Sequence, residues 1–328
     1  IVSASTLYGG TYNLFAHTFP QQGLTVRFAD ARDPASFAPL IDARTKAIFC
    51  ESIGNPLGNV TDIRALADVA HAHGVPLIVD NTVPSPYLLR PFEHGADIVV
   101  HALTKYLNGH GNSIGGAVVD SGKFPWAEHK ERFKRLNEPD VSYHGVVYTE
   151  ALGPAAYIGR VRVVPLRNTG AALSPHNAFL ILQGIETLHL RMDRICENSQ
   201  AIAEALQKHP KVEWVRYAGL KDHPDHALVQ RQLGGRASGI LSFSLKAGDG
   251  DARAAGARFL DALKLFTRLV NIGDAKSLAT HPASTTHRQL DADELAKAGV
   301  SEGMVRLSIG IEHIDDLMAD LTQALDAA

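Results

Sequence analysis

The chain has 328 residues, of which 45% are hydrophobic and 20% are charged, and its formal net charge is only −3. This balance gives no electrostatic reason to expect nucleic acid or an anionic membrane as a partner. With two cysteines, no visible signal peptide and no apolar run near the roughly 20 residues of a membrane span, we expect a cytoplasmic protein without disulfides.

The first part of the chain alternates between strand and helix patterns. Apolar runs at residues 1–5, 26–28, 46–51, 75–82 and 98–103 are typical of buried strands. Residues 61–73 have the apolar spacing of an amphipathic helix, with Thr61 as a start and Gly74 as a stop, and the alternation repeats through Phe92. The pattern therefore predicts an α/β fold with a mainly parallel sheet and helices on both faces.

Polar side chains follow three of these strands. Glu51 and Asn55 come after the first, Asp80 and Thr82 after the second, and Lys105 after the third. Parallel strands linked by right-handed crossovers bring these ends to the same edge of the sheet, where ligands bind in open α/β folds. Taken alone, Lys105 is more simply a solvated lysine, but a cation, a carboxylate and an amide at one edge predict a site.

The chemistry that needs this set is pyridoxal phosphate catalysis. A lysine amine forms a Schiff base with the cofactor aldehyde, and a carboxylate keeps the pyridine nitrogen protonated. Lys105 is the natural amine and Asp80 the natural acid. Thr104, with backbone N–H groups of nearby turns, could bind the phosphate.

Other site motifs fail on their spacing. Gly109-His-Gly-Asn-Ser-Ile-Gly115 has too long a second gap for a dinucleotide fingerprint and leads into a strand pattern at residues 116–120. The segment at Lys123 lacks the upstream glycine of a phosphate loop. His101 and His110 fit no zinc pattern, so we expect no metal.

The second part of the chain predicts a smaller α+β domain. After short helical signals between residues 123 and 168, Ser174 and Pro175 start a long helix whose continuation ends at Pro210. We place a domain boundary near Thr187, giving domains 1–186 and 187–328. Beyond it we expect strands at 212–217, 240–245 and 304–311, and helices at 251–263, from Asp291 with Glu294, and at 314–325.

Arg306 lies inside the last of these strands, between apolar neighbours. Its bidentate fork suits a substrate carboxylate. The residues alone leave an ion pair with a nearby acid equally open.

Several motifs together resemble the Cys/Met-metabolism family of fold-type I pyridoxal phosphate enzymes. They run in order along the chain: Ser5-Thr-Leu-Tyr8-Gly-Gly-Thr-Tyr12, Glu51-Ser-Ile-Gly-Asn55-Pro56, Val79-Asp80-Asn-Thr82, Leu103-Thr-Lys105-Tyr, Gly273-Asp-Ala-Lys-Ser277-Leu and Val305-Arg306-Leu-Ser-Ile-Gly-Ile-Glu312. The resemblance implies that Tyr8, beside a Gly9-Gly10 turn, stacks on the pyridine ring and serves as a possible acid or base. It also implies that Asn55 contacts the cofactor and the substrate carboxylate.

The resemblance assigns the remaining residues as well. Asp80, Thr82, Thr104 and Lys105 would bind the cofactor, while Ser277 and Arg306 would bind the substrate. Glu51 would lie behind the residues that touch the cofactor. The family often has a serine three residues before the lysine, and here that position is Ala102, so one phosphate hydrogen bond is lost or replaced. The resemblance also implies a sizeable N-terminal segment with phosphate ligands, which we expect to be missing from this chain.

Within the family, an insertion near Gly122 to Trp126 resembles the O-acetylhomoserine sulfhydrylase branch. This implies γ-replacement on O-acetylhomoserine by sulfide or a small thiol, giving homocysteine and acetate in methionine biosynthesis, by a homotetramer built from dimers. The alternatives on the same scaffold are cystathionine γ-synthase, O-succinylhomoserine sulfhydrylase and methionine γ-lyase activity. An inactive fragment or scaffold is the non-enzymatic alternative, and a nicotinamide oxidoreductase lacks its fingerprint.

Overall fold

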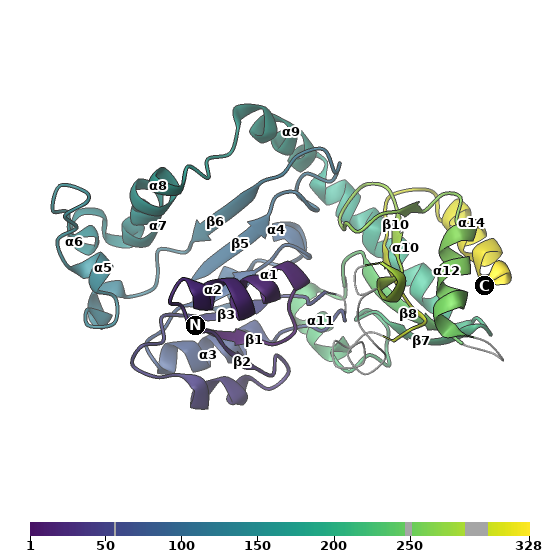
Figure 1. Cartoon of the computed structure of the whole chain (residues 1–328), viewed down its shortest axis with the longest axis horizontal. Helices are drawn as coiled ribbons and strands as arrows, with labels where there is room; N and C mark the ends of the chain where they lie inside the picture. Colours follow the sequence, from purple (N-terminus) through teal and green to yellow (C-terminus); the bar gives the residue numbers. More distant parts are fainter. Residues whose placement is uncertain (56, 247–250, 286–300) are drawn as a thin grey trace.

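The computed structural model describes residues 1–55, 57–246, 251–285 and 301–328, which form two β-sheets with helices packed around them (Figure 1). Pro56 and the predicted helix start at Asp291 and Glu294 lie outside these residues. Within them, no helix is long and apolar enough to cross a membrane.

The first sheet has six strands in the order β2-β1-β3-β4-β5-β6. The first five are parallel, and β6 pairs antiparallel with β5. This confirms the mainly parallel α/β prediction. The bounds are β1 (Val2–Ala4), β2 (Arg27–Ala29), β3 (Ile48–Glu51), β4 (Leu77–Asp80), β5 (Ile98–Ala102) and β6 (Gly116–Asp120).

The second sheet has five strands in the order β7-β8-β11-β10-β9 and is antiparallel except for the pair β9 and β10. It lies to the right of the first sheet in Figure 1. Three of its strands were predicted, but β9 and β10 were missed because they are only two and three residues long. The bounds are β7 (Val212–Arg216), β8 (Ile240–Leu245), β9 (Thr267–Arg268), β10 (Leu278–Thr280) and β11 (Met304–Ser308).

The helices vary widely in length. The α-helices are α1 (Gly9–Asn13), α2 (Phe19–Gln21), α3 (Ile63–Ala72), α4 (Ser85–Leu88), α5 (Lys134–Asn137), α6 (Tyr148–Leu152), α7 (Ala156–Val161), α8 (Arg167–Thr169), α9 (Pro175–Glu186), α10 (Leu188–Lys208), α11 (His226–Leu233), α12 (Ala252–Ala262) and α14 (Ile314–Ala327). Short 3-10 or π-helical turns are Leu14–Thr18, Pro34–Leu40, Pro91–His94, Trp126–His129, Gly153–Ala155, Arg162–Leu166 and Pro282–Ser284.

The crossover helix α3 forms as its sequence predicts, with one difference at its start. Asp62, rather than Thr61, caps it by accepting a hydrogen bond from the N–H of Ala65. Thr61 instead donates its hydroxyl to the backbone oxygen of Glu51 at 2.7 Å. Gly74 ends the helix with a positive φ of 63°, which favours glycine.

Three predictions about helices need correction. Between β4 and β5 the expected full helix is only the four-residue α4 and a 3-10 turn, because Pro84, Pro86 and Pro91 interrupt the segment. Gly9 and Gly10 do not form a turn but begin α1. The long helix after Ser174 is two helices, α9 and α10, which meet at Thr187.

Candidate active site

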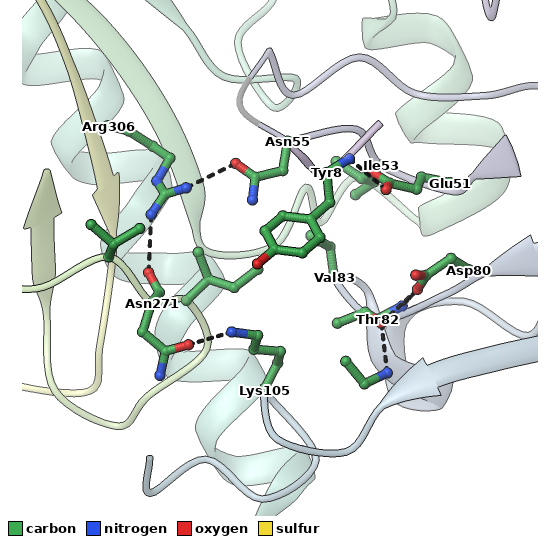
Figure 2. Close-up of a pocket in the computed structure, with 13 residues that line it drawn as sticks. Tyr8, Glu51, Ile53, Asn55, Asp80, Thr82, Val83, Lys105, Asn271 and Arg306 are labelled. Carbon is green, nitrogen blue, oxygen red and sulfur yellow. Dashed lines mark hydrogen bonds between the residues drawn. The ribbon is translucent and has the colours of Figure 1, made fainter. Parts of the chain in front are cut away.

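A cavity opens where the carboxyl ends of β3, β4 and β5 face β11 and the segment between β9 and β10 (Figure 2). Both sheets therefore contribute to one site. Its lining residues are Tyr8, Glu51, Ile53, Asn55, Asp80, Thr82, Val83, Ala102, Lys105, Val270, Asn271, Ile272 and Arg306.

Lys105 follows β5 in a tight turn and extends its side chain into the cavity. Its backbone N–H donates to the carbonyl of Ala102 at 3.1 Å, and its own carbonyl accepts from Gly109 at 2.7 Å. Its Nζ donates to Oδ1 of Asn271 at 2.5 Å. Burial, and then the positive charge of Arg306, lower the pKa of the Lys105 amine. Both effects favour the neutral amine that a nucleophile or base requires.

Asp80 and Thr82 form the opposite, acidic side of the cavity. The hydroxyl of Thr82 donates to Oδ1 of Asp80 at 2.5 Å, and the N–H of Thr82 donates to the same oxygen at 2.9 Å. The N–H of Ala102 donates to the Thr82 hydroxyl at 2.8 Å, which ties β5 to the end of β4. Burial raises the pKa of the Asp80 carboxyl, and the two Thr82 hydrogen bonds oppose that rise.

Glu51 is a second buried acid at this edge, directly across from Asp80 in the register of β3 and β4. Its Oε1 accepts the backbone N–H of Tyr8 at 2.7 Å. Burial, together with the negative charge of Asp80, raises the pKa of Glu51 well above its ordinary value. Glu51 thereby fixes the backbone of Tyr8, whose ring lies in the middle of the cavity in Figure 2.

Arg306 comes from β11 and faces the cavity from the second sheet. Its Nη1 donates to Oδ1 of Asn55 at 3.2 Å and its Nη2 to the backbone oxygen of Asn271 at 3.2 Å. Its Nε is buried and has no hydrogen-bond partner among the described residues. Burial lowers the pKa of this guanidinium. A largely buried arginine whose hydrogen-bond acceptors are neutral suits an incoming carboxylate.

Two predicted site residues do not line the cavity. The Thr104 hydroxyl contacts the backbone of Gly115, accepting its N–H at 3.1 Å. The buried Ser277 hydroxyl donates to Oε2 of Glu312 at 2.9 Å and accepts the N–H of Gly310 at 2.8 Å. The predicted roles of Thr104 at the phosphate and Ser277 at the substrate therefore stay predictions.

The segment of residues 269–277 supplies cavity residues that the sequence analysis missed, above all Asn271. Its fold depends on Gly273, which has a φ of 76° and on which a Cβ would come within 2.6 Å of the Tyr106 backbone nitrogen. Ala275 donates its N–H to Gly109 at 2.8 Å. The segment thus packs against the turn that carries Lys105. The sequence offered one signal for Asn271: it is a polar residue between Val270 and Ile272, two positions before Gly273.

These groups match what pyridoxal phosphate needs from a protein. Lys105 offers an amine of lowered pKa, Asp80 offers an acid in the same cavity, and Arg306 keeps an unused donor for a carboxylate. No group of three His, Cys, Asp or Glu side chains in the described ranges is arranged to hold a metal ion. The fold and the site together define a pyridoxal phosphate-dependent enzyme.

Comparison with known proteins gives the family. Residues 1–326 match the family described as Cys/Met metabolism PLP-dependent enzyme, and the chain belongs to that family. It is 50% identical to the homocysteine synthase of Schizosaccharomyces pombe, over 100% of this chain and 76% of that protein. It is also 50% identical to the O-acetyl-L-homoserine sulfhydrylase of Leptospira meyeri, over 99% of this chain and 74% of the relative.

Solved structures agree with the fold. The crystal structure of an O-acetylhomoserine (thiol)-lyase from Campylobacter jejuni, which carries a pyridoxyl-lysine phosphate, superposes with a TM-score of 0.91 at 41% identity, covering 99% of this chain and 76% of that one. The O-acetylhomoserine sulfhydrylase of Wolinella succinogenes gives a TM-score of 0.82 at 38% identity, covering 99% of this chain and 84% of its own.

Proposed function

We propose that this protein replaces the acetate of O-acetyl-L-homoserine with sulfide or a small thiol, forming L-homocysteine and acetate when the donor is sulfide. In this exchange a C–S bond forms at the γ-carbon, and the C–O bond breaks as acetate leaves with its electron pair. The observation that carries the proposal is the placement of Lys105, Asp80 and the incompletely bonded Arg306 on one cavity. The names of the relatives, at about half identity over nearly the whole chain, support the choice of substrate.

Each residue has a role in the proposal. Bound pyridoxal phosphate supplies an aldehyde for amines and a ring that withdraws electrons from the substrate. Asp80, held by Thr82, would keep the ring nitrogen protonated, and Tyr8 would stack on the ring. Lys105 would release the cofactor to the substrate, take the α-proton and then move protons at the β-carbon, where a proton must be removed before acetate can leave from the γ-carbon. Arg306 and Asn55 would hold the substrate α-carboxylate.

The positions of the charged residues around the cavity support these roles. The acid and the lysine reach the cavity from the ends of β4 and β5 and the arginine from the middle of β11, so a planar ring and an amino acid could contact all three. Burial and the charge of Arg306 lower the pKa of Lys105, which suits a group that must lose a proton before it can act as a base.

The decisive experiment replaces Lys105 by Ala and supplies O-acetylhomoserine plus sulfide. We expect homocysteine formation to fall on the order of 10²–10⁴-fold, and borohydride to no longer fix the cofactor to the protein. Lys123→Ala, at an exposed lysine on another loop, is the matched control and should behave as wild type. Undiminished turnover in Lys105→Ala contradicts the proposal. Formation of 2-oxobutanoate and ammonia by wild type would instead indicate elimination.

We further infer the assembly and the domain boundary. Phe179, Leu182 and Leu190 are 56%, 62% and 63% exposed on α9 and the start of α10. Exposed apolar side chains gathered along one stretch are typical of a subunit interface, which supports an assembly of several subunits such as the expected homotetramer. The break at Thr187 supports domains of residues 1–186 and 187–328. Light scattering in solution tests the tetramer, and a monomer would contradict it.

A cytoplasmic location belongs to the same proposal. Cys50 and Cys196 are both free and buried, as suits a reducing compartment. Fractionation of cells that express a tagged copy tests this location.

A further inference from the structure

The Lys105 amine has a single hydrogen-bond partner among the residues that the structure describes, Oδ1 of Asn271 at 2.5 Å. Asn271 comes from the opposite sheet's connecting segment, so the contact crosses the cavity (Figure 2). The other end of the same residue is also engaged, because its backbone oxygen accepts Nη2 of Arg306 at 3.2 Å. One residue therefore touches both the amine and the guanidinium.

The chemistry of this partner matters as much as its position. An amide oxygen accepts a hydrogen bond from either a neutral amine or an ammonium group, and it carries no net charge. A carboxylate in its place would stabilise the ammonium form and raise the lysine pKa by about 1 to 3 units. An amide can therefore hold the amine in place while leaving its protonation free to change.

The charged groups around the amine point to the same conclusion. Arg306 faces it from β11, and its charge lowers the lysine pKa. Tyr8, Glu51 and Asp80 face the cavity from the first sheet, and none of them is a hydrogen-bond partner of the amine within the described ranges. Asn271 is thus the group that fixes the direction of Nζ.

We propose that Asn271 is a positioning residue, whose neutral side-chain carbonyl orients the Lys105 amine toward the reacting carbon atoms without fixing its protonation state. The inference rests on the proposed function, since it presumes that Lys105 is the proton-transferring group. Arg306 anchors Asn271, because its hydrogen bond to the Asn271 backbone oxygen holds the backbone from which the amide projects.

The test is a comparison of pH profiles of kcat for the holoenzyme and two variants. Asn271→Ala removes the hydrogen bond, so we expect kcat to fall on the order of 10²-fold at every pH, with the acid limb of the profile unmoved. In Asn271→Asp we expect the acid limb to move to higher pH by about 1 to 3 units, with activity partly recovered in alkaline buffer. A merely structural role would not separate the two variants in this way.

Asn55→Asp is the matched control, because it places the same new charge on the same cavity but beside Arg306. We expect it to move the acid limb less than Asn271→Asp does, since the arginine neutralises the charge. Asn271→Gln, which keeps the amide, guards against loss of folding, and we expect it to retain more activity than Asn271→Ala. Absorbance of the bound cofactor and circular dichroism check that each variant is loaded and folded.

The outcomes separate the two proposals. If Lys105→Ala is inactive but Asn271→Ala and Asn271→Asp reproduce the wild-type profile, the role of Asn271 is wrong and the proposed function stands. If Lys105→Ala is fully active, the proposed function itself fails. If Asn271→Asp and Asn55→Asp move the acid limb equally, the effect comes from the general field of the cavity and the positioning role is overturned.

Discussion

The two walls of the cavity are built differently. On the wall at the ends of β4 and β5, Asp80 accepts two hydrogen bonds from Thr82, whose hydroxyl is fixed in turn by the N–H of Ala102. On the wall formed by β11 and residues 269–277, Arg306 contacts only neutral oxygens and keeps a buried Nε without a partner in the described chain. The first wall fixes its acid through hydrogen bonds to Oδ1 of Asp80, while the second has one buried donor, Nε of Arg306, without a partner among the described residues.

The difference teaches how such a site divides its tasks. A resident cofactor needs an acid held in one orientation, which the two hydrogen bonds from Thr82 provide, with Thr82 itself held by the N–H of Ala102 on β5. A substrate enters and leaves at each turnover. It therefore needs hydrogen-bond donors that contact neutral oxygens while the site is empty and form stronger, charge-assisted hydrogen bonds with the substrate carboxylate when it binds. Changes on the two walls should therefore have distinguishable effects on catalysis.

The largest effect should come from the cofactor wall. In Asp80→Ala, we expect kcat to fall on the order of 10²–10³-fold, because the acid that would keep the ring nitrogen charged is gone. Dialysis followed by absorbance should also show faster loss of cofactor. Steady-state kinetics with saturating cofactor gives the measurement, and a normal kcat under those conditions would contradict the role.

A smaller effect should follow on the substrate wall. Arg306→Lys keeps a positive charge but removes the planar fork, so we expect loss of about 1.5 to 3 kcal/mol of carboxylate binding. The KM for O-acetylhomoserine should rise on the order of 10- to 100-fold, while the cofactor absorbance stays unchanged. A constant KM together with loss of cofactor would contradict this assignment, because it would mean that Arg306 binds the cofactor and not the substrate.

The smallest catalytic effect should come from Ser277, just outside the cavity. Its hydroxyl joins Glu312 and the N–H of Gly310 in the structure. We expect Ser277→Ala to lower the free energy of unfolding by about 1 to 3 kcal/mol with little change in KM. Thermal unfolding and kinetics on the same preparation check this. A large rise in KM without loss of stability would favour the substrate-binding role predicted from the sequence.

The sequence predicts the cofactor wall far better than the substrate wall. The acid and the lysine follow directly from strand patterns, because parallel strands must end at one edge, and β3, β4 and β5 confirm this. Asn271 could not be found in that way. It lies on an irregular segment between two very short strands, and its contacts with Lys105 and Arg306 depend on residues 166 and 35 positions away.

Local errors have equally physical causes. Two glycines predicted a turn at Gly9, but α1 begins there, capped by no side chain. The long helix after Ser174 divides at Thr187, where Arg191 turns inward and donates to the carbonyls of Gly184, Tyr106 and Leu107. That contact joins segments some 80 residues apart in the chain, so no window of local sequence contains it.

The anchoring of residues 269–277 has a practical consequence. The N–H of Gly273 donates to Ser308 at 3.0 Å, that of Ala275 to Gly109 at 2.8 Å, and that of Ile311 to Ala275 at 2.9 Å. These amides join the lysine turn, the connecting segment and the arginine strand in one chain of contacts. Deuterium uptake at these amides therefore reports whether the two sheets separate during turnover. The measurement needs no change to any side chain.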